Sequence, residues 1–288
     1  MAFFAAILFG VLEGITEWLP VSSTGHLILL SEVLTLSVGE SVGEGFPEAF
    51  RELFDVLIQL AAVLAVLWRF FSRLNPFSRQ KSLEERRATW RLYGFILLSG
   101  IPAMLIAFGL DPLLERLTGR DIDGWFYRSE IVAAALILYG IVFLTVDRKS
   151  TVKGKPLTAV RALTVGCFQA LAVIPGTSRS GATILGGLLS GLDRKTAAEY
   201  SFFLAVPTMV GAGAIRMVSF FSYLTEKGYA MPKEGYAVLL LGMATAFIVS
   251  LLSIDFLMDF VKRSTLRAFG VYRIILGIAV WILLLSTR

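Results

Sequence analysis

The chain has 288 residues, of which 56% are hydrophobic and 17% are charged, and its formal net charge is +5. About a quarter of the residues of a soluble domain are charged, so this composition excludes an ordinary soluble protein and indicates an integral membrane protein. Lysine and arginine fall mostly in short loops between apolar runs, where membrane topology accounts for them. The positive charge therefore indicates no nucleic-acid partner.

The first apolar stretch, residues 2–34, is interrupted by Pro20. It lacks a basic start and a small-residue cleavage site, so we expect no signal peptide to be removed. A break in a membrane helix frees backbone groups that lipid cannot satisfy, so we expect a re-entrant helix-loop-helix hairpin buried in protein or lining a watery cavity. Candidate functional residues gather around this break: Glu13, Glu17, Ser22, Ser23, Thr24 and His26, the only histidine of the chain.

Six later segments are long and apolar enough to cross a hydrocarbon core of about 30 Å as helices. They cover residues 53–71, 91–109, 130–147, 197–218, 236–258 and 268–286. A second interrupted stretch, residues 159–190, contains Pro175 and Gly176 followed by hydroxyl residues, and predicts a second re-entrant hairpin. The sequence thus predicts one all-α polytopic membrane domain over residues 1–288.

Loop charges predict the orientation of these segments. The loops at 69–91 and 148–161 are rich in lysine and arginine, and we expect them to be cytoplasmic. The loops at 111–129 and 219–235 carry fewer basic residues, so we expect them outside, with both termini. The first hairpin then enters from outside and the second from the cytoplasm.

The opposed hairpins suggest an inverted repeat with halves of approximately 1–150 and 151–288. Each half holds one hairpin and three spanning helices, an odd number that reverses the second half. Several residues of the two hairpins match at an offset of 156: Gly10 with Gly166, Ser22 with Ser178, Gly25 with Gly181, and Glu13 with Gln169. Chance similarity among apolar helices is the alternative.

Glu13 and Glu17 are candidate metal ligands. Their spacing of four places both carboxylates on one helix face, about 6 Å apart, where like charges repel. A hard divalent ion such as Mg²⁺ or Ca²⁺ would suit them, because carboxylate and phosphate oxygens are its usual ligands. A solvated helix face, or a proton shared by the two carboxyl groups, is the alternative.

The second hairpin predicts a phosphate cradle. Its glycines would let backbone N–H groups approach an anion, a helix starting near Ser180 would point its positive end at the anion, and the guanidinium of Arg179 would grip phosphate. The candidate binding residues are Gly176, Ser178, Arg179, Ser180 and Thr183. Close helix packing could explain the glycines and Ser180, but not an arginine at membrane depth.

His26 could be a general acid or base, a nucleophile or a metal ligand. Its position three residues after Ser23 favours a catalytic role over a structural one. Ser23 is then a candidate nucleophile and Ser22 a helix cap, although capping alone could explain both serines. Asp55 and Gln59, four apart, could extend a polar cavity, but hydrogen bonding between helices is the favoured interpretation.

These motifs resemble the undecaprenyl-diphosphate phosphatase family associated with bacitracin resistance. The resemblance covers essentially the whole chain. Its matching segments are Glu13–Glu17, Pro20–His26, Phe54–Leu60, Pro175–Thr183 and Tyr200–Pro207. It implies hydrolysis of undecaprenyl diphosphate to undecaprenyl phosphate and inorganic phosphate, which recycles the lipid carrier of bacterial cell-wall synthesis. It also implies dependence on Mg²⁺ or Ca²⁺ and a site on the periplasmic side of the inner membrane.

Residue by residue, the resemblance places the functional groups on Glu13, Glu17, Ser23, His26, Ser178, Arg179 and Thr183. As a hypothesis, Glu13 and Glu17 hold a divalent ion against the diphosphate, while Arg179 offsets the charge of the transition state. Ser23 or a water attacks the terminal phosphorus and His26 transfers the proton. Direct attack by His26 is the main variant.

A transport protein is the rival class, because lipid-phosphate flippases and anion transporters with inverted repeats and broken helices would share this architecture. Two carboxylates beside His26 argue against it, because an anion carrier gains little from negative charge near its substrate. The expected partners are the polyprenyl diphosphate and surrounding membrane lipids. The sequence leaves open the metal, the lipid chain length and the oligomeric state, including a homodimer.

Overall fold

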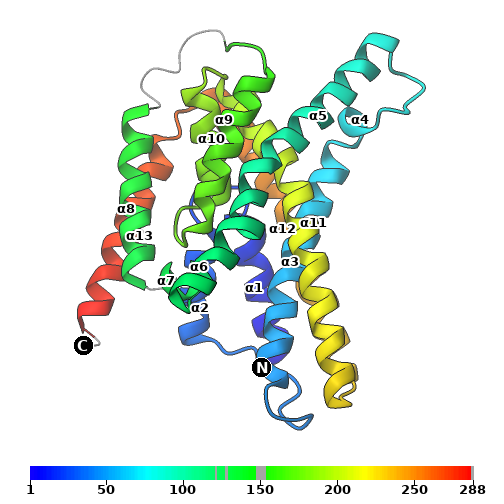
Figure 1. Ribbon diagram of the computed structural model, residues 1–288, viewed down its shortest axis with the longest axis vertical. Helices are drawn as coiled ribbons and strands as arrows, with labels where there is room; N and C mark the ends of the chain where they lie inside the picture. The colour runs from blue at the N-terminus through cyan, green and yellow to red at the C-terminus, as the bar shows by residue number, and fades with distance from the viewer. Residues whose placement is uncertain (121, 127–128, 147–153, 287–288) are drawn as a thin grey trace. The chain divides into compact units, whose positions relative to one another are not determined.

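The computed structural model is all-helical over the residues it describes, which are 1–120, 122–126, 129–146 and 154–286 (Figure 1). The helices α1 to α7 and the π-helix η1 have the bounds α1 Ala2–Thr16, α2 Ser23–Val33, α3 Phe46–Arg69, α4 Phe71–Leu74, α5 Leu83–Leu105, η1 Ile106–Leu110, α6 Asp111–Thr118 and α7 Ile122–Phe126. The remaining helices are α8 Ser129–Val146, α9 Ala159–Ala170, the 3-10 turn η3 Leu171–Val173, α10 Arg179–Leu189, α11 Arg194–Lys227, α12 Lys233–Arg263 and α13 Arg267–Ser286.

The helices have the length and composition of a polytopic membrane protein. Three helical stretches among the described residues are long and apolar enough to cross a membrane: Leu83–Thr118, Arg194–Lys227 and Lys233–Arg263. Shorter apolar helices cover Ala2–Thr16, Glu130–Val146 and Ala159–Val173. Large apolar side chains are exposed along these helices, among them Leu240 and Leu252 of α12, as expected of a surface that lies in lipid.

Each segment expected to span the membrane contains a helix, but several helix ends differ from the expectation. Helix α3 starts at Phe46, seven residues early, because Gly45 adopts a left-handed φ of 79° and Pro47 suits a first turn. Helix α5 starts at a capping box formed by Ser82 and Glu85. Four basic residues counted in the loop charges lie outside the described residues: Arg128, Arg148, Lys149 and Lys153.

The chain forms two compact units, each of which draws residues from both sequence halves. The first unit comprises Met1–Trp18, His26–Phe71 and Ala205–Asp255. The second comprises Leu19–Gly25, Ser72–Leu204 and Phe256–Arg288. The loop between α1 and α2 therefore belongs to the same unit as the loop between α9 and α10, although about 150 residues separate them in the sequence.

In the first unit, α1 packs against α12 through small residues. A Cβ on Gly10 would lie 2.6 Å from the Gly242 carbonyl oxygen, and one on Gly14 would lie 2.9 Å from that of Ala246. Such close approach needs glycine and is typical of helix pairs in membranes. On its other side α1 contacts the buried aromatic side chains of α3, where the ring centroids of Phe9 and Phe54 are 6.3 Å apart.

In the second unit, α8 and α13 run side by side (Figure 1). Glycines again permit the contact, because a Cβ on Gly140 would lie 2.7 Å from the Gly270 carbonyl oxygen. Helix α9 packs against α5, where a Cβ on Gly166 would clash with the Ser99 backbone. Gly166 is the residue that the offset of 156 pairs with Gly10, so both members of this pair lie at a close helix contact.

Candidate functional site

The two interrupted stretches have the same local backbone at equivalent positions. Ser22 (φ 76°) and Ser178 (φ 65°) are the non-glycine residues with positive φ in the described part of the chain. The Ser22 hydroxyl oxygen accepts the backbone N–H of Gly25 at 3.4 Å, and that of Ser178 accepts the N–H of Gly181 at 3.2 Å. The prediction of Ser22 as a helix cap is confirmed, and Ser178 caps α10 in the same way.

The positive φ of these two serines is unfavourable. A non-glycine residue held there costs on the order of 1–3 kcal/mol and persists only where the surroundings fix it. Ser22 is 1% exposed, so packing around it is close. The cap leaves other N–H groups of the first turn of α2 and α10 without a partner inside the helix, and these ends favour negative charge.

Arg273 of α13 joins the two breaks, which are the loops between α1 and α2 and between α9 and α10. One Nη of its guanidinium donates to the Pro20 carbonyl at 3.2 Å, and the other donates to the carbonyls of Gly176 at 2.7 Å and Thr177 at 3.0 Å. Its Cζ lies 5.5 Å from the ring centroid of Tyr139 on α8. Arg273 is 0% exposed, and a buried cation inside an apolar helix pairs with carbonyls in this way because lipid cannot solvate it.

A second bond joins the same two loops. The Ser180 hydroxyl donates to the Leu19 carbonyl at 3.1 Å, and Ser180 is buried. Gly176 is held close to α8, where a Cβ would lie 2.6 Å from the Val132 carbonyl oxygen, and its φ of +88° also requires glycine. Ser180 and Gly176 thus have structural partners in this structure, and their contact with a phosphate stays a prediction.

Arg179 and Thr183 lie on the first turns of α10 and contact α11. An Nη of Arg179 donates to the Ser201 carbonyl at 2.8 Å, and the hydroxyl oxygens of Thr183 and Ser201 are 2.6 Å apart. Arg179 is partly exposed, whereas Thr183 is buried. The bond to Ser201 orients the guanidinium at the start of α10, which begins one residue before the expected position.

Glu13 and Glu17 lie at the end of α1 in the first unit. The helical bond from Glu17 N–H to the Glu13 carbonyl, 3.0 Å long, confirms that the two residues are one turn apart on one face. Both are buried, with 0% of Glu13 and 6% of Glu17 exposed. The Gly10 and Gly14 contacts with α12 fix the rotation of α1 and therefore the direction of these carboxylates.

Ser23 and His26 lie on the first turn of α2, and both are partly exposed. Their spacing of three places them on one helix face. Ser23 belongs to the second unit with Ser178 and Arg179, whereas His26 belongs to the first with Glu13. That all of these residues act on one substrate stays a prediction.

Sequence reasoning missed Arg273 and Ser201. Arg273 was detectable as an arginine inside the apolar run 268–286, although its carbonyl partners were not. The interpretation of Asp55 was wrong, because its carboxylate accepts from Arg51 of its own helix at 2.9 Å rather than bonding between helices. The guanidinium of Arg51 lies 3.9 Å from the ring centroid of Phe9, and so links α3 to α1.

The donor set of Glu13 and Glu17 fits a hard divalent cation. Two buried carboxylates on one face supply the oxygen ligands that Mg²⁺ and Ca²⁺ prefer. No group of three or more histidine, cysteine or acidic residues suited to a metal occurs among the residues that the structure describes. A cation held here would therefore need further oxygen ligands from substrate or water, as is common for Mg²⁺.

Comparisons of the sequence with known proteins match the chain to one family. Residues 6–279 match the family model described as bacitracin resistance protein BacA. An undecaprenyl-diphosphatase of Latilactobacillus sakei is 43% identical over 281 residues, which cover 96% of this chain and 95% of that protein. One of Streptococcus pyogenes serotype M5 is 43% identical over 278 residues, covering 94% and 92%.

Proposed function

Because the chain belongs to the bacitracin resistance protein BacA family, we propose that it hydrolyses undecaprenyl diphosphate to undecaprenyl phosphate and inorganic phosphate. The observation that carries this function is the 43% identity, over nearly the whole chain, to proteins named undecaprenyl-diphosphatase. The reaction returns the lipid carrier of bacterial cell-wall synthesis to use.

The second unit binds the diphosphate. A guanidinium has five N–H donors in a planar fork, and the bond to the Ser201 carbonyl orients this fork in Arg179. The N-terminal amides of α10 add positive potential at the same place. Ser178 and Thr183 lie on this turn and contribute hydroxyl groups, while Ser180 and Gly176 hold its position relative to the first break.

Ser23 and His26 carry out the attack on phosphorus and the proton transfer that accompanies it. A nucleophilic oxygen, from Ser23 or a water, bonds to the terminal phosphorus, and the bond from that phosphorus to the bridging oxygen breaks. His26 accepts the proton of the attacking group, as its spacing from Ser23 on α2 allows. If Ser23 attacks, water then hydrolyses the phosphoserine; direct attack by His26 would form a phosphohistidine instead.

Glu13 and Glu17 hold a divalent cation, Mg²⁺ or Ca²⁺. When bound, the cation supplies positive charge that offsets the phosphoryl oxygens. The family resemblance assigns both Glu17 and Arg179 to the site, and it supports the proposal that they act on the same diphosphate.

The proposed topology has six spanning helices and two re-entrant hairpins in an inverted repeat, with the site facing the periplasm from the inner membrane. The matching caps at Ser22 and Ser178 support the repeat. Within the second unit, basic segments expected in the cytoplasm lie at one end, where Arg73, Arg91 and Leu157 line one cavity. A homodimer stays a prediction that a mass measurement in detergent would test.

Phosphate release separates the enzyme from a transport protein. The purified full chain should release inorganic phosphate from a polyprenyl diphosphate, and a chelator should abolish the release. Glu17→Gln should lose release by at least about 100-fold but still bind substrate, whereas Glu234→Gln, which changes an exposed carboxylate of α12, should match the wild type. Substrate binding without any release by the wild type would favour a carrier, a class that the names of the relatives do not support.

A further inference from the structure

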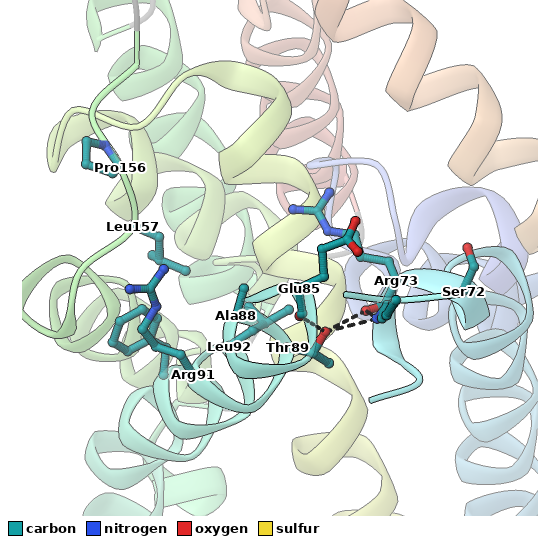
Figure 2. Close-up of a pocket in the computed structure, with 11 residues that line it drawn as sticks. Ser72, Arg73, Glu85, Ala88, Thr89, Arg91, Leu92, Pro156 and Leu157 are labelled. Carbon is teal, nitrogen blue, oxygen red and sulfur yellow. Dashed lines mark hydrogen bonds between the residues drawn. The ribbon is translucent and has the colours of Figure 1, made fainter. Parts of the chain in front are cut away.

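A cavity of about 490 Å³ lies in the second unit, where α4, the loop after it and the first half of α5 meet the segment before α9. Figure 2 shows Arg91 and Leu157 at one side of this cavity and Arg73 and Ser72 at the other, with Glu85 and Thr89 of α5 between them. The lining residues are Ser72, Arg73, Lys81, Glu85, Ala88, Thr89, Arg91, Leu92, Phe95, Pro156 and Leu157. None of them belongs to the candidate functional site described above.

The lining of the cavity is positively charged. It contains three cations, Arg73, Lys81 and Arg91, and one acid, Glu85. The Glu85 carboxylate accepts the N–H of Ser82 at 2.7 Å in the capping box, and its charge offsets one of the cations. Arg73 is paired with Glu199, so the remaining cation leaves an excess of positive charge that favours an anion.

The three cations differ in how strongly the protein itself uses them. Arg73 pairs with the buried Glu199, and Lys81 donates to the Arg73 carbonyl at 2.7 Å and to the Thr89 hydroxyl at 2.9 Å. The Arg91 side chain makes no hydrogen bond or ion pair with the residues that the structure describes. Its guanidinium lines the cavity and is the cation with most donors left for a ligand.

Aromatic side chains next to the cavity-lining residues in the sequence indicate a level near a membrane surface. Phe77 and Trp90 are 76% and 54% exposed, and their ring centroids are 5.9 Å apart. Tyr93 stacks edge-on against Trp90 at 5.6 Å, and its hydroxyl donates to the Leu74 carbonyl. Exposed tryptophan and tyrosine mark the boundary between hydrocarbon and headgroups.

The wall of the cavity combines charged and apolar side chains. Leu92, Phe95 and Leu157 line it together with the cations. A ligand with one negative charge and a hydrocarbon tail matches this mixed lining better than a free ion does. We propose that the cavity binds the phosphate headgroup of an anionic membrane phospholipid, with Arg91 as its main cationic contact.

Native mass spectrometry of the full chain, released from mixed micelles with equal amounts of phosphatidylglycerol and phosphatidylcholine, tests the proposal. The wild type should retain phosphatidylglycerol preferentially. Arg91→Gln should lower this retention about fivefold, as expected for one interfacial charge. Arg87→Gln removes the same charge from an exposed position of α5 outside the cavity, and should leave retention unchanged.

Three results would overturn the proposal: equal retention of the two lipids by the wild type, equal loss in Arg91→Gln and Arg87→Gln, or displacement of the lipid by millimolar inorganic phosphate alone. The last result would identify a site for a free anion. Arg91 is exposed, so its variant should fold, and a matching thermal midpoint in detergent checks this. Phosphate release is measured separately and should be the same in both variants, so failure of the proposed function would not affect this test.

Discussion

The two breaks share a backbone but carry different chemical groups. Each ends in a serine with positive φ whose hydroxyl caps the next helix. At equivalent positions the first break has Glu13 and Glu17, where the second has Gln169 and Val173, and the second has Arg179 where the first has Ser23. In the proposed repeat, the shared backbone is the scaffold, and the two copies differ in carrying acids in the first break and the proposed phosphate-binding cation in the second.

The largest expected effect on stability comes from Arg273, whose guanidinium bonds to both breaks. Arg273→Met leaves the carbonyls of Pro20, Gly176 and Thr177 without their donor, and each buried acceptor left unsatisfied costs about 1–3 kcal/mol. We expect a large fall in the thermal midpoint in detergent and loss of phosphate release. Arg273→Lys should recover part of both, and Arg263→Met, an exposed arginine of α12, should change neither. An unchanged midpoint in Arg273→Met would show that the two breaks do not need this clamp.

The glycines at equivalent helix contacts give the next largest effect. Gly10→Ala would place a Cβ 2.6 Å from the Gly242 carbonyl oxygen, and Gly166→Ala would clash with the Ser99 backbone. Since backbone must shift, we expect each to destabilise the protein by about 1–3 kcal/mol. Gly94→Ala and Gly211→Ala meet no atom within 4 Å and should be neutral or up to about 1 kcal/mol more stable. Equal thermal midpoints for all four variants would contradict these contacts.

The two caps should respond alike to paired substitutions. Ser22→Ala and Ser178→Ala lose the cap and keep the positive φ, so each should cost about 1 kcal/mol. Ser22→Gly and Ser178→Gly also lose the cap but relieve the backbone, so they should be close to the wild type in stability. Chemical unfolding in detergent compares the four variants. Opposite responses at the two positions would remove the structural equivalence of the breaks.

Asp193 provides a third cap, without positive φ, as a reference for the other two. Its carboxylate accepts the Thr196 backbone N–H at 2.9 Å and the Thr196 hydroxyl at 2.7 Å. Partial burial raises the pKa of Asp193, but the hydrogen bonds from Thr196 and neighbouring amides outweigh it and hold the pKa below its usual value. The Asp193 carboxylate therefore stabilises the fold at a pH above its pKa in the unfolded chain. This stability is lost as the pH falls through its pKa in the folded protein.

The Asp193→Asn variant should therefore have a lower thermal midpoint than the wild type. The difference should be largest near neutral pH, where it corresponds to about 0.5–1 kcal/mol. The difference should begin to shrink below about pH 4, where an aspartate of the unfolded chain becomes protonated, and should vanish once the pH is below the lowered pKa of the folded carboxyl. A difference that stays constant down to pH 3 would mean that the ionised carboxylate adds nothing to the cap.

Local patterns in the sequence were enough to predict the helices, both breaks and the Ser22 cap. Pro20 and Pro175 mark the breaks because proline cannot continue an interior helical bond ladder. Contacts between distant residues were not predictable, because no local pattern relates Arg273 to Pro20 across 253 residues. The Asp55 interpretation failed for the opposite reason, since Arg51, one turn away, supplied the partner.

The central proposal, which rests on the family resemblance, is that Glu17 and Arg179 act on the same diphosphate. A double-mutant cycle of Glu17→Gln and Arg179→Gln, read as kcat/KM for phosphate release, tests it most directly. Groups that stabilise one transition state as a unit are strongly non-additive, so we expect each single variant to lose about 100-fold or more and the double variant to lose little beyond the worse single. Losses that multiply fully in the double variant would contradict the claim.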